Sequence, residues 1–327
     1  MQRVLIAAAK AVTLVASVLL ANAAPASAEW PNDRPIRVLV GFGPGGGTDI
    51  VTRIIAQPLG ELLKQSVVVE NKPGAGGTIA SNDVAKAAKD GYTATMISTG
   101  HTISAVMLKS QPYDAVKDFA PVALVANSAF VVVARKDFPA NDLKGLIALA
   151  KAQPGKLNFA SVGLGSTQHF AGELLAQSTG IKVTHVPYRG TPALMTALLA
   201  GQVDYGVELA HAVQGQVQAG SLKLLAFGTP ERWPTIPDVP TVAEQGVPGY
   251  SVTGWYGWVY PAGTPQAIVD KTYAAIKEVL ERPAVREQLA KAGAVVHLES
   301  PAQFGKHLAD EVAKWKTVRD KAGLEPQ

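Results

Sequence analysis

The chain has 327 residues, 47% hydrophobic and 17% charged, so it can bury a sizeable core and is not intrinsically disordered. Its 30 lysine and arginine residues against 26 acidic residues give a net charge of +4, which is no evidence for nucleic-acid binding. Cysteine is absent, which excludes disulfide scaffolds, cysteine-ligated zinc, iron–sulfur clusters and thiol catalysis.

The first 28 residues have the features of a secretory signal peptide. Arg3 and Lys10 supply positive charge, residues 11–24 form an uncharged apolar run, and Ala26-Ser27-Ala28 matches a small-residue cleavage site. A membrane anchor usually needs about 20 apolar residues, so the short run favours cleavage over anchoring. We therefore expect a mature chain that begins at Glu29, works in the periplasm and carries no lipid anchor.

Strands and helices then alternate along the chain. The β-branched and apolar runs at 36–40, 66–70 and 92–97 predict strands. Residues 48–64 carry apolar residues at a helical period, with an expected kink at Pro58, and residues 78–88 also look helical. A long apolar run at 122–134 predicts a strand that is broken at Asn127-Ser128.

A second series of strands and helices follows. Asn141 is the expected N-cap of a helix that ends near residue 153. Further helices are expected at 167–178 and from Thr191-Pro192 to Gly201, and at 264–281 before a stop at Pro283. Ser300 and Gln303 form a capping box that opens the last helix. Strands are expected at 157–161, 183–186, 203–207, 222–227 and 250–260.

This alternation predicts an α/β fold of parallel sheets with helices on both faces. The long strand-like runs at 122–134 and 250–260 bracket the second series, so we expect two lobes joined by two crossover strands. Lobe one would comprise residues 29–126 plus 255–327, and lobe two residues 127–254. Such a molecule would open and close about hinges near Asn127 and Gly254.

A glycine-rich loop follows the first strand. Gly41-Phe42-Gly43-Pro44-Gly45-Gly46 matches the dinucleotide-binding pattern G-x-G-x-x-G, but Pro44 removes a backbone donor and export disfavours an NAD-dependent dehydrogenase. No Gly-Lys-Ser/Thr follows, so the loop is not a Walker A motif. Gly45, Gly46, Gly47 and Thr48 place backbone N–H groups at a helix N-terminus, which suits an anion. At Gly46 we expect a bulky side chain to block this approach and to conflict with a positive φ; a turn that binds nothing is the alternative.

The second series repeats this arrangement at residues 162–169. Gly165, Ser166 and Thr167 lie between a strand and a helix, and His169 falls in the first helical turn. The loop is not a G-x-S-x-G nucleophile elbow, because no glycine stands two residues after Ser166. Two such loops, one in each lobe at the carboxyl ends of strands, are the arrangement expected around a ligand in open α/β sheets.

Seven segments together resemble one family. They are RPIRVLVGFGPGGGTDIVTR, VENKPGAGG, KDGYT, YDAVKDFAPV, HVPYRGTPALMTALLAGQVD, RWPTIPDVPTVAEQGVPGY and WYGWVYPAGTP. Over about residues 30–325 the chain is similar to the Bug-type extracytoplasmic solute receptors of tripartite tricarboxylate transporters. The resemblance implies a two-lobed periplasmic binding fold of type II-like topology with a ligand cleft between the lobes. It also implies a receptor rather than an enzyme, which takes a small organic carboxylate and delivers it to a membrane permease.

The candidate ligand-binding residues come from both glycine loops and from polar positions at other strand ends. They are Phe42, Gly45, Gly46, Gly47, Thr48, Asp49, Thr99, Gly165, Ser166, Thr167, His169, Tyr188, Arg189 and Asp204. Asp49 could instead pair with Arg53, Arg189 could form a surface salt bridge, and Asp204 could hold a neighbouring loop. Glu208 is unusual for a site meant for anions: it could select a ligand with a cationic or hydroxyl group, or it could be solvated. One of Trp255, Tyr256 and Trp258 could line the cleft.

We expect no metal, no cofactor, no nucleic-acid partner and a monomeric protein. The six histidines show no HExxH pattern or paired metal spacing. The alternatives to a receptor are an exported hydrolase and a rigid exported domain of unknown activity. Turnover of an acid, as against its stoichiometric binding, distinguishes the hydrolase from the receptor.

Overall fold

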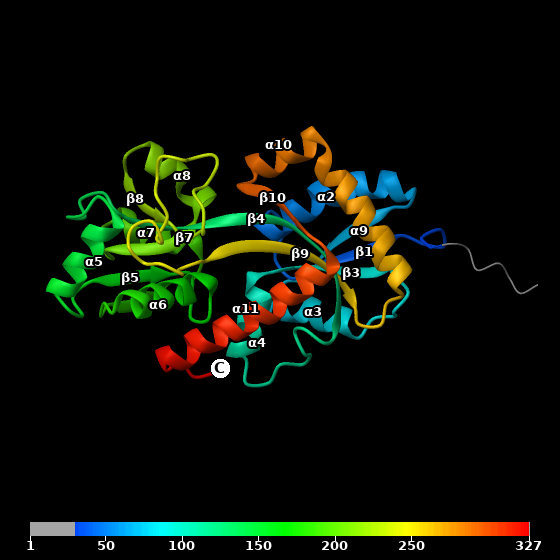
Figure 1. Ribbon diagram of the computed structural model, residues 1–327, viewed down its shortest axis with the longest axis horizontal. Coiled ribbons are helices and arrows are strands. Elements are labelled where there is room, and N and C mark those ends of the chain that lie inside the picture. Colours follow the sequence, from blue (N-terminus) through cyan, green and yellow to red (C-terminus); the bar gives the residue numbers. More distant parts are fainter. Residues whose placement is uncertain (1–29, 327) are drawn as a thin grey trace, which may run out of the picture.

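The computed structural model describes residues 30–326, so the predicted signal peptide lies outside the described residues. Within that range, no helix combines the length and the apolar character needed to cross a membrane. Two groups of helices and strands lie on either side of two strands that run between them (Figure 1). The two-lobed α/β architecture predicted from the sequence is confirmed.

Lobe one begins with short strands, of which β1 has its β-branched residues buried, and with helices that carry one apolar face. In the first helix, Val51, Ile55 and Leu59 lie on the buried face, and the helix continues through Pro58. The elements of this part are β1 (Ile36–Val40), α2 (Gly47–Leu63), β2 (Val67–Asn71), η1 (Ala75–Gly77), α3 (Thr78–Ala85), β3 (Thr93–Ser98) and α4 (Thr99–Met107).

The strand β4 (Phe119–Arg135) belongs to both lobes. It runs for 17 residues, and the predicted break at Asn127-Ser128 is wrong, because both residues remain paired with neighbouring strands. Its first part pairs with strands of lobe one, and its second part, from Phe130, pairs with strands of lobe two. A single strand therefore connects the two halves of the sheet.

Lobe two contains the second series of strands and helices. Its elements are α5 (Leu143–Ala152), β5 (Asn158–Ser161), α6 (Thr167–Thr179), β6 (Thr184–Pro187), α7 (Thr191–Leu199), β7 (Tyr205–Leu209), α8 (Ala210–Gln218) and β8 (Leu222–Phe227). The predicted N-cap of the first of these helices is wrong by one residue: the Asp142 side chain accepts from the N–H of Gly145 and caps α5, and Asn141 does not.

The chain then returns to lobe one. Its last elements are β9 (Thr253–Pro261), α9 (Gln266–Glu281), α10 (Pro283–Lys291), β10 (Ala294–Glu299) and α11 (Pro301–Ala322). Pro283 ends α9 as predicted but also occupies the first position of α10, where its missing N–H costs nothing. The capping box of Ser300 and Gln303 is confirmed at the start of α11.

One mixed sheet of ten strands runs through the molecule. Its main path is β2-β1-β3-β9-β4-β7-β5-β6, with β10 and β8 also paired to β4. Strand pairs are parallel within each lobe and antiparallel around β4 and β9. Consequently β1, β3, β5 and β7 end toward the middle of the molecule, each followed by a helix.

The C-terminal helix packs on both lobes. It lies along lobe one below β9 and reaches toward α6 of lobe two (Figure 1). Trp315 stands edge-on to Phe170 of α6 with 5.8 Å between ring centroids, and Gln177 donates to the carbonyl oxygen of Val318. Arg319 donates to the carbonyl oxygen of Val106 in α4. One hydrophobic cluster therefore includes residues of α4, α6 and α11.

Candidate functional site

A cleft of about 510 Å³ lies between the two lobes at the carboxyl ends of the parallel strands. Both lobes contribute to its wall. Lobe one supplies Phe42, Gly46, Gly47, Thr48, Gly76, Ser98, Thr99, Gly100 and Ser104, and lobe two supplies Val162, Gly163, Leu164, Gly165, Ser166, Thr167, Gln168 and Leu209. The crossover strands supply Ser128, Phe130, Gly254, Trp255 and Tyr256.

The first glycine loop positions the N-terminus of α2 at the cleft. The backbone N–H groups of Gly47 and Thr48 have no acceptor within residues 30–326, because the first turn of a helix has no carbonyl to bond them. The positive φ in this loop, 82°, is at Gly45, and Gly46 has φ −74°. The expectation of a positive φ at Gly46 is therefore wrong, since its backbone suits any residue.

Asp49 holds this loop from inside. Its carboxylate accepts from the N–H of Gly45 at 2.9 Å, from Arg53 at 3.0 Å and from Asn71 at 2.8 Å. Burial would raise the pKa of Asp49, but these hydrogen bonds outweigh it and hold the pKa below its usual value. The side chain is 3% exposed and does not line the cleft. Asp49 thus stabilises the loop whose N–H groups face the cleft.

The second glycine loop positions α6 in the same way. The Ser166 hydroxyl caps the helix by accepting from the N–H of His169 and donates to the carbonyl oxygen of Gly163. Gly165 has φ 72°, a backbone conformation that other residues rarely adopt. The N–H groups of Thr167 and Gln168 have no acceptor in the described chain and lie at the cleft wall.

His169 supports this loop from below. Its Nδ1 accepts from the N–H of Gly165 at 3.2 Å, and its ring stacks on His185 with centroids 4.0 Å apart. Burial, with the neighbouring charge of His185, lowers the pKa of His169 to about 4. The ring is 2% exposed and lies outside the cleft lining. It therefore holds the loop as a neutral imidazole.

Two more helices begin at the cleft. Thr99 and Gly100 start α4, and the Thr99 hydroxyl accepts from the N–H of Trp255, which ties α4 to β9. Leu209 precedes α8 and also lines the cleft. The N-termini of α2, α4, α6 and α8 therefore all meet here, and their dipoles make the cleft electropositive.

Among the described residues, those that line the cleft include no lysine, arginine, histidine, aspartate or glutamate. Its polar groups are hydroxyls, one amide and backbone N–H groups, and its apolar wall includes Phe42, Phe130, Leu164 and Leu209. Such a cleft can bind an anion by hydrogen bonds and helix dipoles, without an ion pair.

Three further predicted residues are not part of the cleft lining. Asp204 precedes β7, at the end of the strand opposite Leu209. It accepts hydrogen bonds from Arg135 and from the N–H of Asn158, so it holds a neighbouring segment, as the alternative expectation states. Tyr188 packs against the lobe-two core, and Arg189 is exposed. None of the three lines the cleft.

Several lining residues were missed by sequence reasoning. Ser128, Phe130 and Gly254 lie in the crossing strands, where period-2 alternation alone does not say which face meets a ligand. Gln168 directly follows the second glycine loop, and its position in the first turn of the helix could have indicated that it lies at the cleft. Of the three aromatic residues in the second crossing, Trp255 and Tyr256 line the cleft and Trp258 is buried.

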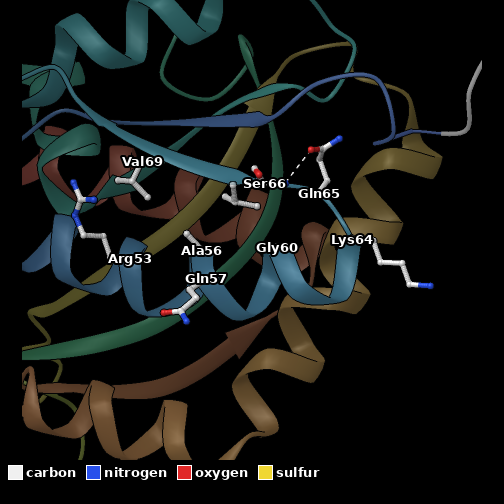
Figure 2. A pocket seen from close by; sticks show the side chains of 9 residues that line it. Arg53, Ala56, Gln57, Gly60, Lys64, Gln65, Ser66 and Val69 are labelled. Atoms are coloured by element: carbon white, nitrogen blue, oxygen red, sulfur yellow. Dashed lines mark hydrogen bonds between the residues drawn. The ribbon is translucent and has the colours of Figure 1, made fainter.

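A second hollow of about 690 Å³ lies on the outside of lobe one, between the side of α2 and β2 (Figure 2). Ala56, Gly60 and Val69 line it, and the Lys64 side chain points away from it. None of its lining residues begins a helix, so no helix N-terminus opens into it to attract an anion. The inter-lobe cleft is therefore the candidate site.

Comparison with known proteins gives a consistent result. Residues 51–324 match a family model described as the tripartite tricarboxylate transporter family receptor. The periplasmic binding protein BugD is 34% identical, with a TM-score of 0.75, over 90% of this chain and 99% of BugD. Rpa4515 of R. palustris, solved with adipate, is 33% identical, with a TM-score of 0.79, over 91% and 100% of the two chains.

MatC of Rhodopseudomonas palustris, solved with bound malate, is 35% identical, with a TM-score of 0.74, over 88% of this chain and 99% of MatC. The matching family is one of receptors and not of enzymes, so neither the dehydrogenase nor the hydrolase alternative is supported. The two-lobed fold, the two glycine loops and the family match over most of the chain agree. The chain belongs to the tripartite tricarboxylate transporter receptor family.

Proposed function

We propose that this chain is a periplasmic receptor that binds a small organic carboxylate in the inter-lobe cleft and delivers it to the permease of a tripartite transporter. The observation that carries the proposal is the meeting of four helix N-termini at a cleft where none of the described lining residues is charged. Helix N-termini favour anions, and an uncharged wall has no carboxylate that would repel an anionic ligand.

Two of the similar structures support this ligand class. One was solved with adipate and the other with malate, and both are dicarboxylates. Each lobe of this chain presents one glycine loop, so a dicarboxylate can place one carboxylate on each loop. Phe42, Phe130 and Leu209 would then flank the carbon chain between them.

The proposed contacts are the predicted residues that line the cleft. They are Phe42, Gly46, Gly47, Thr48, Thr99, Gly165, Ser166 and Thr167. Gly45, Asp49 and His169 hold the two loops in place. Tyr188, Arg189 and Asp204 are not part of the proposed contact set.

The proposal includes the predicted cleavage after Ala28, the lobes 29–126 plus 255–327 and 127–254, and a monomeric mature protein. The description of BugD as a periplasmic binding protein supports the compartment. The change of partners along β4, near Ala129 and Phe130, supports the boundary between the lobes.

Thermal unfolding of the mature protein with a panel of organic acids tests this function. Succinate, malate, adipate and citrate form the panel, and sodium chloride of equal ionic strength is the control. We expect at least one acid to raise the Tm, because a ligand at 100 times its Kd stabilises the folded state by about 2.7 kcal/mol. The acid should be recovered unchanged. Conversion of it into product, or no rise with any organic acid, contradicts the proposal.

A further inference from the structure

A buried carboxyl group lies directly behind one side chain of the cleft wall. Gln168, in the first turn of α6, lines the cleft and is 8% exposed. Its Nε2 donates to Oε1 of Glu208 at 3.0 Å. Glu208 itself is fully buried and does not line the cleft, although it precedes the lining residue Leu209.

Glu208 accepts hydrogen bonds from three donors. Besides Gln168, the N–H of Leu209 donates to Oε1 at 2.8 Å, and the hydroxyl of Thr191 in α7 donates to Oε2 at 2.8 Å. No cation pairs with Glu208 in the part of the chain that the structure describes. Both carboxyl oxygens therefore have hydrogen-bond partners within the protein. The carboxyl group can act on the cleft by orienting the side chain of Gln168.

These contacts fix the orientation of the Gln168 amide. Because the N–H of Leu209 donates to Oε1 of Glu208, that oxygen is an acceptor whether Glu208 is ionised or protonated. In the structure the amide nitrogen of Gln168 faces this oxygen, so the carbonyl oxygen of the same amide faces away from Glu208. Gln168 Oε1 accepts from no described residue, and it is not among the buried polar atoms that lack a partner. It is thus an open acceptor on a residue of the cleft wall.

The same residue offers a donor and an acceptor to a ligand. The backbone N–H of Gln168 is one of the free donors at the N-terminus of α6, where the proposed function places a carboxylate. A carboxylate bound to that N–H would bring a substituent on its neighbouring carbon toward the side chain of the same residue, Gln168. Only a substituent that donates a hydrogen bond satisfies its carbonyl oxygen, and the electropositive helix end disfavours an ammonium group there.

We propose that Gln168, oriented by Glu208, is a specificity-determining residue that selects a 2-hydroxy carboxylate over the same acid without the hydroxyl. The inference rests on the proposed function of the cleft. It assigns to Glu208 a positioning role and explains why a carboxyl group lies next to a site for anions.

Calorimetric titration of the wild-type protein with malate, succinate and aspartate tests the selection. Malate and succinate differ by one hydroxyl, and aspartate carries an ammonium group in its place. We expect malate to bind roughly tenfold more tightly than succinate, since succinate leaves the Gln168 acceptor without a partner. In Gln168→Met, which has similar length and no acceptor, the ratio of the two affinities should fall to about 1.

Two variants at Glu208 separate orientation from packing. Glu208→Gln retains an acceptor for Gln168 and for the N–H of Leu209, so the ratio of malate affinity to succinate affinity should stay as in the wild type. Glu208→Met removes the acceptor and frees the Gln168 amide, so the ratio should fall as in Gln168→Met. Circular dichroism checks that each variant folds, and Gln168→Met carries the test alone if Glu208→Met does not.

The outcomes are distinct. A wild-type ratio near 1, or a ratio that Gln168→Met leaves unchanged, overturns the inference and leaves the proposed function standing. Tighter binding of aspartate than of malate overturns the assignment to a hydroxyl. Binding of no acid contradicts the proposed function itself, and the inference falls with it.

Discussion

Gly46 and Gly47 are neighbours in the first loop, but a side chain would meet different surroundings at each. At Gly46 a Cβ atom would have only the carbonyl oxygen of Gly43 within contact range, at 3.4 Å. At Gly47 it would lie 2.6 Å from the hydroxyl oxygen of Tyr256, so the crossing strand and the loop approach closely there. The absence of a side chain at Gly46 therefore leaves space for a ligand, whereas at Gly47 it leaves space for the Tyr256 side chain.

Replacing Gly46 with valine should weaken carboxylate binding with little effect on folding. The backbone at Gly46 has φ −74°, which valine adopts without strain, and the added methyl groups occupy the cleft wall beside free N–H groups. We expect at least a tenfold loss of affinity, about 1.4 kcal/mol, by calorimetry. Gly43→Ala is the matched control, because nothing lies within 4 Å of its Cβ and it does not line the cleft. Unchanged affinity in folded Gly46→Val would show that the loop is only a turn.

At the scale of elements, α6 and the glycine loop before it depend on two stacked histidines. His185 accepts from or donates to Ser161 at 2.7 Å, and His169 lies between His185 and the N–H of Gly165. The nearest carboxylate, Glu173, lies 3.8 Å from Nε2 of His169. Burial lowers the pKa of both histidines to about 4, so both are neutral in the folded protein at neutral pH.

This arrangement predicts a loss of stability on mild acidification. Below about pH 6.5 the unfolded chain binds protons at these histidines, while the folded protein does not until about pH 4. The free energy of unfolding should therefore fall as the pH is lowered through this window. Each histidine contributes a slope of up to ~1.4 kcal/mol per pH unit.

Urea unfolding between pH 4.5 and 7.5 measures this slope. His169→Asn is the variant to compare, because its side-chain oxygen can accept from Gly165 without titrating. The variant should show a smaller slope than the wild type and keep the Gly165 hydrogen bond. An equal slope in both proteins would exclude His169 as a source of the pH dependence.

For the whole molecule, two kinds of connection between the lobes have opposite effects on motion. The crossing near Asn127 and Gly254 consists of paired strands that can bend. The C-terminal helix α11 packs its Trp315 against Phe170 of lobe two, and Lys314 lies 4.2 Å from the Trp315 ring centroid. Because the contact between Trp315 and Phe170 joins the lobes on one side of the cleft, we expect a hinge-like motion in which this contact is kept or the two rings slide past each other.

Ligand binding should therefore make the protein more compact. Closure removes the ligand from water and presents one defined shape to a permease. Small-angle X-ray scattering with and without a saturating acid should show a smaller radius of gyration in the bound state. Sodium chloride at the same ionic strength is the control. A radius that stays constant within error on saturation favours a rigid exported domain.

Much of this protein could be predicted from neighbouring residues alone. Strand and helix periods, the capping box at Ser300 and the glycine loops at 45–48 and 163–166 are local patterns, and each is present in the structure. The short helix η1, the helices α4, α8 and α10 and the strand β10 were not predicted. Six of the nine residues of α4 are buried, so it shows no polar face, and β10 exists because β4 pairs with it.

The details of the site depend on residues that are distant in sequence. Gln168 meets Glu208 across 40 residues, and Thr99 meets the N–H of Trp255 across 156. The sequence could place glycine loops at the ends of strands, because turns need glycine wherever they occur. Which side chains surround those loops is decided by strand pairing around β4 and by the packing of α11, since both bring parts of the two lobes together.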